Sequence, residues 1–287
     1  MVTLIVFVLE ERKGYVSNKT LNELVFIGLG LYDEKDISLR GLEELKEADT
    51  VFAEFYTSLM PGLSIKKLEE MIGKPVRVVS RRVLEEEDGQ IIFEAAKKGK
   101  AAFLVQGDPM IATTHVDLRI SAEKRGIKTR VIHGASVVSA VRGISGLQNY
   151  KFGKAVTIPF SEEGFVSETP YKVIIENKKM GLHTMCYLDI KAEEQRYLTV
   201  NEALQTLLEL EKQKKEQVAT SMTLVIGVAR AGSPEPIVKA GYLEDVIEYD
   251  FGAPPHTLIF PGKLHFMEAE ALIALADAPQ EVMEIAE

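Results

Sequence analysis

Two glycine-bearing turns follow predicted strands and have the composition of ligand-binding loops. Gly28-Leu29-Gly30 comes directly after the apolar run 24–27, and Gly107-Asp108-Pro109 comes after the run 101–105. Glycines let backbone amides approach a ligand closely, and ligands of open α/β sheets collect at the carboxyl ends of strands. Gly-Asp-Pro by itself is also a common turn. Together, the two turns are candidate parts of one binding site.

The first turn is similar to a dinucleotide-binding loop but lacks its third glycine. Asp33 occupies that place and Asp36 follows it. Two carboxylates at the entry to a helix would repel a pyrophosphate. Glu54, at the end of the next strand, could bind a ribose in an NAD-dependent dehydrogenase, but the missing glycine makes that interpretation weaker. We therefore expect a ligand that is cationic or carries no phosphate.

Two further residues follow or precede predicted strands, and each has an ordinary structural interpretation. Ser136 could cap a helix, and His256, which follows two prolines, could be a structural histidine at the start of a strand. Hydrolase and NTPase functions are not indicated, because the sequence has no Gly-x-Ser-x-Gly elbow and no P-loop. No metal site is expected either, because metal-ligand spacing is lacking among the five histidines: His115, His133, His183, His256 and His265.

The elements that must position these residues fall into two groups. In the first half, predicted strands alternate with predicted helices, which favours a mostly parallel sheet covered on both faces. The strands are 24–27, 50–53, 76–79, 101–105 and 129–132, and the helices are 39–48, 65–72, 91–98 and 116–124. The acidic stretch 85–88 is interpreted as the solvated start of a helix.

The second half has a looser order, typical of a mixed α+β domain. Its predicted strands are 155–158, 183–188, 224–230 and 257–260, its predicted helices are 171–179 and 200–214, and 232–241 suggests a hairpin-like link. We expect an N-terminal extension at 1–20, an α/β domain at 21–132 and an α+β domain at 133–287. The binding cleft is expected between the two domains.

Composition excludes several classes of protein. The 287 residues are 46% hydrophobic and 27% charged, which suffices for a sizeable core. The net charge of −9 argues against direct nucleic-acid binding. Cys186 is the only cysteine, so no intramolecular disulfide is possible and a reducing, cytoplasmic location is expected. The apolar run 4–9 is far shorter than the roughly 20 residues of a membrane span, and the charged segment 10–13 after it does not fit a signal peptide.

Seven segments, taken in order, resemble the diphthine synthase family of the tetrapyrrole-methylase-like class. They are 27–33 (IGLGLYD), 53–58 (AEFYTS), 107–115 (GDPMIATTH), 150–154 (YKFGK), 188–192 (LDIKA), 229–233 (ARAGS) and 254–256 (PPH). The glycine turn and Gly-Asp-Pro are shared by the whole class, whereas the other segments are specific to the family. The likeness begins near Leu21, so residues 1–20 are assigned no role.

The resemblance implies a function and a set of contacts. It implies a cytoplasmic, homodimeric methyltransferase that binds S-adenosylmethionine between two α/β domains and releases S-adenosylhomocysteine. The substrate would be translation elongation factor 2, on which a histidine carries an aminocarboxypropyl group whose amine is trimethylated to give diphthine. Cofactor contacts would fall on Leu31, Asp108, Ile111, Ser136, Val137, Leu188, Ala231 and His256. Before Ser136 the family commonly has proline, where this chain has Ala135. The group that accepts the amine proton is not identifiable from the sequence.

Two other functions stay open at this point. A precorrin-type tetrapyrrole methyltransferase would share the glycine turn and Gly-Asp-Pro, but would not predict the 53–58 and 254–256 segments. A noncatalytic α/β protein of the translation machinery would not bind adenosylmethionine.

Overall fold

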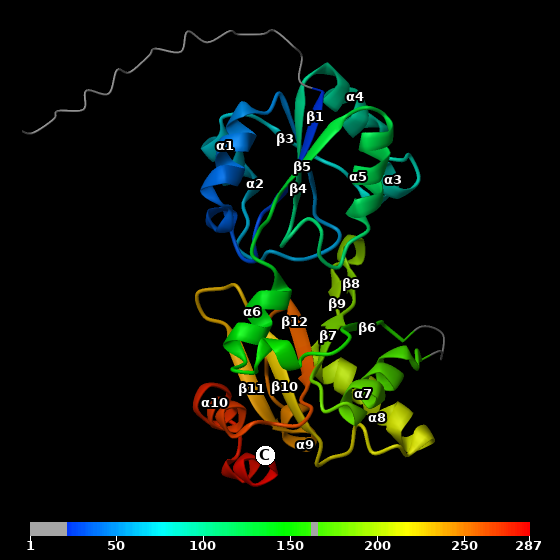
Figure 1. Ribbon diagram of the computed structural model, residues 1–287, viewed down its shortest axis with the longest axis vertical. Helices are drawn as coiled ribbons and strands as arrows, with labels where there is room; N and C mark the ends of the chain where they lie inside the picture. Colours follow the sequence, from blue (N-terminus) through cyan, green and yellow to red (C-terminus); the bar gives the residue numbers. More distant parts are fainter. Residues whose placement is uncertain (1–21, 162–165) are drawn as a thin grey trace, which may run out of the picture.

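Two five-stranded sheets, stacked along the long axis of the molecule, form the framework of the chain (Figure 1). This computed structural model describes residues 22–161 and 166–287. The extension predicted at 1–20, with its apolar run, lies outside the described residues. No helix within the two described ranges is long and apolar enough to cross a membrane.

The first sheet is entirely parallel, which confirms the prediction for this half of the chain. Its strands, in spatial order, are β3 (Val76–Val78), β2 (Thr50–Glu54), β4 (Lys100–Val105), β1 (Glu23–Gly28) and β5 (Lys128–Ile132). One face is covered by α1 (Leu39–Glu47) and α2 (Ile65–Ile72), and the other by α3 (Arg81–Glu85), α4 (Gln90–Lys98) and α5 (His115–Lys124) (Figure 1).

The central strand β1 shows why both faces are covered. Its side chains alternate, so Leu24 and Phe26 belong to the core under α4, whereas Val25 and Ile27 belong to the core under α1. All six residues of the strand are buried. A continuous apolar run of this kind is stable only between two helical layers, as the parallel arrangement provides.

The acidic stretch 85–88 does not form the helix start that the sequence had predicted. Glu85 ends the short helix α3 instead of beginning a helix, and the next helix, α4, begins at Gln90. Asp88 and Gly89 between them both adopt positive φ angles, of 53° and 63°, which break the helical path. The sequence pattern did not distinguish one charged helix start from two short elements joined by a turn.

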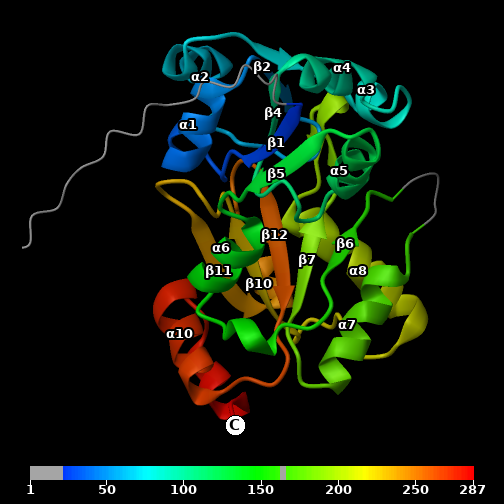
Figure 2. The same ribbon diagram turned by 45° about the horizontal axis from the view of Figure 1, so that its top comes forward.

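The second sheet is mixed, as predicted for this half. Its order is β11 (Ile237–Tyr242), β10 (Leu224–Ala229), β12 (His256–Phe260), β7 (Thr184–Leu188) and β6 (Val156–Ile158), and only the pair β6–β7 is parallel. The link after β10 is a true hairpin. Figure 2 shows α7 (Thr169–Lys179) and α8 (Val200–Lys214) on one side of this sheet and α6 (Val137–Ile144) and α10 (Phe266–Ala276) on the other. The smaller elements are β8 (Ile190–Lys191), β9 (Arg196–Tyr197) and α9 (Leu243–Val246).

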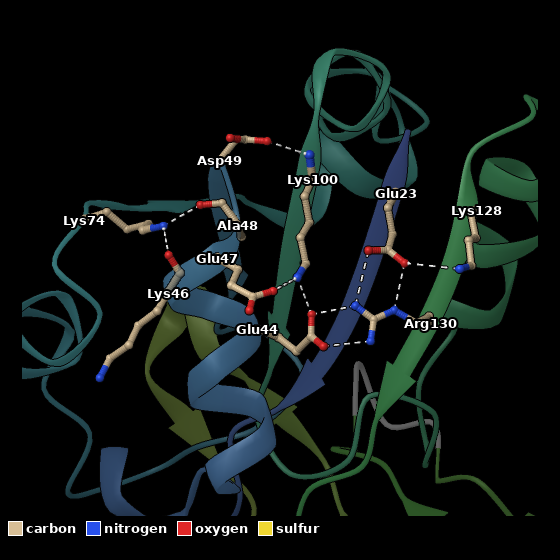
Figure 3. A network of polar contacts seen from close by, with 10 residues as sticks. All are labelled: Glu23, Glu44, Lys46, Glu47, Ala48, Asp49, Lys74, Lys100, Lys128 and Arg130. Atoms are coloured by element: carbon tan, nitrogen blue, oxygen red, sulfur yellow. Dashed lines mark hydrogen bonds and ion pairs between the residues drawn. The ribbon is translucent and has the colours of Figure 1, made fainter. Parts of the chain in front are cut away.

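A network of charged side chains closes the amino ends of the first sheet, opposite the second sheet (Figure 3). Glu44 of α1 lies at its centre and pairs with both Arg130 of β5 and Lys100 of β4, each at 2.5 Å. Glu23, the first residue of β1, pairs with the same guanidinium, whose Nε lies 2.7 Å from Oε1 of Glu23. The network therefore joins α1 to three strands.

These contacts change the titration of Glu44. Hydrogen bonds from Arg130, assisted by Lys100, lower the pKa of Glu44 to about 2, although burial opposes the change. A carboxyl group whose pKa is lower in the folded protein stabilises the fold above its unfolded pKa of about 4.3, and this stabilisation disappears as the pH falls toward the folded pKa.

Glu44→Gln should lower the free energy of unfolding by about 1–2 kcal/mol at pH 7. The difference from the wild type should shrink as the pH falls from 5 to 2, because the wild-type carboxyl becomes protonated there. Urea unfolding at several pH values measures this. Glu43→Gln, at an exposed position of the same helix, is the matched control. A constant difference over the whole pH range would contradict the role given to the charge of Glu44.

Candidate functional site

A cavity of about 340 Å³ lies between the carboxyl ends of the first sheet and the facing edge of the second. The loops after β1, β2, β4 and β5 contribute to one wall, and residues of β7, β12 and the β10–β11 hairpin contribute to the other. The structure brings together in this cavity all eight residues predicted from the sequence: Leu31, Asp108, Ile111, Ser136, Val137, Leu188, Ala231 and His256. Their contact with a cofactor remains a prediction.

Three glycines let the loops of the first sheet touch one another. A Cβ atom on Gly28 would lie 2.5 Å from the carbonyl oxygen of Gly107 and 2.5 Å from the amide nitrogen of Gly134, too close for any side chain. The Gly107 N–H also donates to the Gly30 carbonyl at 2.6 Å. The loops after β1, β4 and β5 therefore form one continuous backbone surface at the cavity.

The first glycine turn is already occupied by a carboxylate of the chain itself. The N–H groups of Leu31 and Tyr32 donate to Oδ2 of Asp36, at 3.0 and 2.7 Å. These are the amides that a phosphate would otherwise use. The arrangement gives a direct reason why this turn is unsuited to a pyrophosphate.

Glu54 has a structural role that differs from the ribose contact considered for it. Its buried carboxylate accepts hydrogen bonds from the N–H groups of Tyr56 and Thr57, at 3.0 and 3.2 Å, and from the Thr57 hydroxyl at 2.5 Å. Burial raises the pKa of Glu54 despite these bonds. The side chain fixes the loop after β2 and is not free to bind a ribose.

Asp108 lies at the start of a tight turn, directly after Gly107, which has a φ of 72°. One carboxylate oxygen accepts the Met110 N–H at 2.9 Å, and the other lies 2.7 Å from Nδ1 of His133. A carboxylate has about four acceptor positions, so these bonds leave capacity for a ligand. The turn holds Asp108 firmly in the cavity wall.

Ser136 is the helix cap that its position suggested, and its contact with a cofactor stays a prediction. Its hydroxyl oxygen accepts the Val138 N–H at 3.2 Å as the N-cap of α6, and the residue also lines the cavity. The amino end of α6 is therefore part of the wall, and the following residue, Val137, supplies an apolar surface beside it.

The imidazole of His256 belongs to the second sheet. Its Nδ1 accepts the Val200 N–H at 3.4 Å, and its Nε2 lies 3.2 Å from the Gly252 carbonyl. Burial lowers the pKa of His256, so the ring is neutral at pH 7 and donates from Nε2. The residue begins β12, as a structural histidine at a strand start would, and its ring also stabilises the start of α8, a contact that the sequence did not suggest.

Three charged residues of the cavity were not predicted as cofactor contacts, Arg81, Glu85 and Asp189, and neither was the aromatic Tyr56. Tyr56 follows β2 and Arg81 follows β3, so the carboxyl-end rule could have found both. The lining residues include three carboxylates, those of Glu85, Asp108 and Asp189, and one guanidinium, that of Arg81. This excess of negative charge favours a cationic ligand.

Comparison with known proteins relates this architecture to a family. Residues 23–247 match the family model of the tetrapyrrole (corrin/porphyrin) methylases. The chain is 53% identical over 266 residues to a diphthine synthase of Methanosarcina mazei, covering 91% of this chain and 98% of that one. A diphthine synthase of Methanocaldococcus jannaschii is 50% identical over 256 residues, covering 88% and 99%.

A solved structure agrees with both comparisons. The crystal structure of a diphthine synthase superposes with a TM-score of 0.83 at 42% identity, covering 92% of this chain and all of that one. The expected two-domain tetrapyrrole-methylase-like fold is confirmed by this likeness. The chain belongs to the tetrapyrrole methylase family and, within it, to the diphthine synthases.

Proposed function

We propose that the chain is an S-adenosylmethionine-dependent N-methyltransferase of diphthamide biosynthesis. It trimethylates the amine of the aminocarboxypropyl-modified histidine on translation elongation factor 2 to give diphthine, and releases S-adenosylhomocysteine. One observation carries the proposal: in a member of the diphthine synthases, all eight residues expected to contact the cofactor line a single cavity between the two sheets. Relatives of about 50% identity that bear this name favour it over a tetrapyrrole substrate.

The cavity has properties that suit adenosylmethionine. Its volume of about 340 Å³ lies within the usual range of small-molecule sites. The carboxylate of Asp36 occupies the amides that would bind a phosphate, and adenosylmethionine carries none. The excess of carboxylates suits a ligand with both a sulfonium and an ammonium group. Asp108 has acceptor positions left for the polar groups of the cofactor.

The chemistry requires positioning more than reactive side chains. When bound, the cofactor supplies a methyl group that its sulfonium already activates. The chain must hold the substrate amine in line with that group, and such positioning can contribute up to roughly 7–11 kcal/mol in ideal cases. The amine has to be neutral before each transfer, so one proton leaves per methyl group. The continuous backbone surface built on Gly28, Gly107 and Gly134 supplies the rigid wall for this alignment.

The proposal extends to organisation and location. We infer an N-terminal domain at 21–132 and a C-terminal domain at 133–287, with the chain entering the second unit through α6.

We also infer a cytoplasmic homodimer. Exposed apolar side chains of α10, those of Phe266, Met267 and Leu275, supply surface for a twofold contact. Light scattering should give about twice the chain mass of 31.9 kDa.

The function is tested by methyl transfer to the protein substrate. Elongation factor 2 carrying the aminocarboxypropyl histidine is incubated with the purified chain and labelled adenosylmethionine, and the modified peptide is analysed by mass spectrometry. Three methyl groups on that residue are expected, and factor with an unmodified histidine should gain none. Absence of transfer, or transfer only to a tetrapyrrole, would refute the proposal.

Asp108→Ala should weaken adenosylmethionine binding by about 1.5–3 kcal/mol, since hydrogen bonds to charged groups contribute in this range. His256→Ala should weaken it less, because the imidazole bonds to Val200 and Gly252. The histidine variant should instead lower the thermal midpoint more clearly. Titration calorimetry and thermal denaturation measure the two effects. A greater loss of affinity at His256 than at Asp108 would contradict these roles.

A further inference from the structure

Arg81 stands apart from the other charged residues of the cavity. It is the only lysine or arginine among the described residues that line it. It begins α3, three residues after the carboxyl end of β3, and its side chain is 60% exposed. In a cavity whose other charged residues are acidic, an anionic group would bind preferentially at this cation.

The neighbouring residues hold the guanidinium in a defined orientation. Its Cζ lies 5.3 Å from the centre of the Tyr56 ring, and its Nε lies 3.5 Å from Oε1 of Glu85. The Tyr56 backbone is in turn fixed by its hydrogen bond to the buried carboxylate of Glu54. One face of the guanidinium therefore lies against the Tyr56 ring, and its Nε faces Glu85. The two terminal nitrogens of Arg81 are left for a partner. A guanidinium presents such nitrogens as a fork that matches a carboxylate.

The position of Arg81 separates it from the expected cofactor contacts. In the first sheet, the loops that carry Leu31, Asp108 and Ser136 follow β1, β4 and β5, on one side of the sheet order. Arg81 follows β3, the strand at the opposite edge, and Tyr56 follows β2 beside it. The arginine is therefore placed to meet a second molecule that enters the cavity beside the cofactor.

We propose that Arg81 binds the carboxylate of the aminocarboxypropyl group that the enzyme methylates. The inference rests on the proposed function, because that substrate carries an α-carboxylate next to the reacting amine. A bidentate pair would fix the carbon that bears the amine, while the carboxylates elsewhere in the cavity repel the anion from other positions. Arg81 thus positions the substrate and determines specificity for an α-amino acid group.

The test compares three variants with the wild type. Arg81→Gln removes the charge, Arg81→Lys keeps the charge without the fork, and Arg82→Gln alters the neighbouring arginine, which pairs with Glu86 and Glu87 outside the cavity. Three constants are measured for each: KM for modified elongation factor 2, Kd for adenosylmethionine by calorimetry, and Kd for factor with an unmodified histidine.

Arg81→Gln should raise KM for the modified factor by about 10- to 100-fold, the usual effect of a charged hydrogen bond. Arg81→Lys should recover part of that loss, and Arg82→Gln should resemble the wild type. The other two constants should stay within twofold for all variants. Circular dichroism confirms that each variant is folded.

Several outcomes would overturn the inference. An unchanged KM would exclude a carboxylate contact. A matching loss of adenosylmethionine affinity would show that Arg81 binds the carboxylate of the cofactor instead. An equal loss of affinity for the unmodified factor, or an equal effect of Arg82→Gln, would indicate general docking of the protein surface. If the wild type fails to methylate the modified factor, the proposed function itself fails and this inference with it.

Discussion

The close contact of three backbone segments at Gly28, Gly107 and Gly134 is the constraint on which the cavity depends. A Cβ atom on Gly28 or Gly134 would collide with backbone atoms of the neighbouring loops, and Gly107, whose carbonyl oxygen both would meet, has a φ of 72° that favours glycine. The contact brings the carboxyl ends of β1, β4 and β5 together, although β4 and β1 are separated by about 70 residues of chain. Backbone packed against backbone has little freedom to relax, so this wall keeps its shape.

The polar groups of the site are arranged around that wall. Asp36 satisfies the amides of the first turn, Asp108 is held by the turn after β4, and Ser136 caps α6 after β5. A second contact ties the other sheet to the same wall, because a Cβ atom on Gly232 would collide with the side chain of Leu31. The cavity is thus closed by loops from both sheets, and its acidic lining suits a cationic cofactor.

The amino ends of the strands in the first sheet are held together in a different way from their carboxyl ends. There, charged side chains instead of glycines join the strands, with Glu44 between Arg130 and Lys100 (Figure 3). The ion pairs stabilise one end of the sheet, which leaves the other end to loops that bind ligands. This division between a stabilising end and a functional end is expected of open parallel sheets.

Much of the fold could be predicted from the sequence, because the central strands β1 and β4 are apolar runs that lead into glycine turns, and helices alternate with the strands of this half. Helix α10 was missed: its residues are apolar almost all round, so no stripe with helical period stands out. Helix α3 was missed because it is only five residues long. The eight cofactor positions came from the family resemblance, since Leu188 and Ala231 have side chains without distinctive chemistry.

Arg81 and Glu54 show what local patterns leave out. Arg81 becomes a candidate site residue only in the folded structure, where β3 lies at the edge of the sheet and the Tyr56 ring lies against its guanidinium. Glu54 could have contacted a ribose by its place after β2, yet its hydrogen bonds to Tyr56 and Thr57 turn it inward. The first outcome depends on a contact between two segments, and the second on a local turn whose hydrogen bonds the residue types alone do not specify.

The central claim, that the glycine contact shapes the cofactor site, is tested most directly by adenosylmethionine titration of Gly134→Ala. Gly143→Ala is the control, because a Cβ atom there, within α6, meets no atom within 4 Å. Overpacking typically costs about 1–3 kcal/mol of stability, and the loops can relieve it only by moving apart, which displaces the wall of the cavity. The folded Gly134→Ala protein should therefore bind about tenfold or more weakly, and the control should bind as the wild type. Wild-type affinity in folded Gly134→Ala would contradict the account.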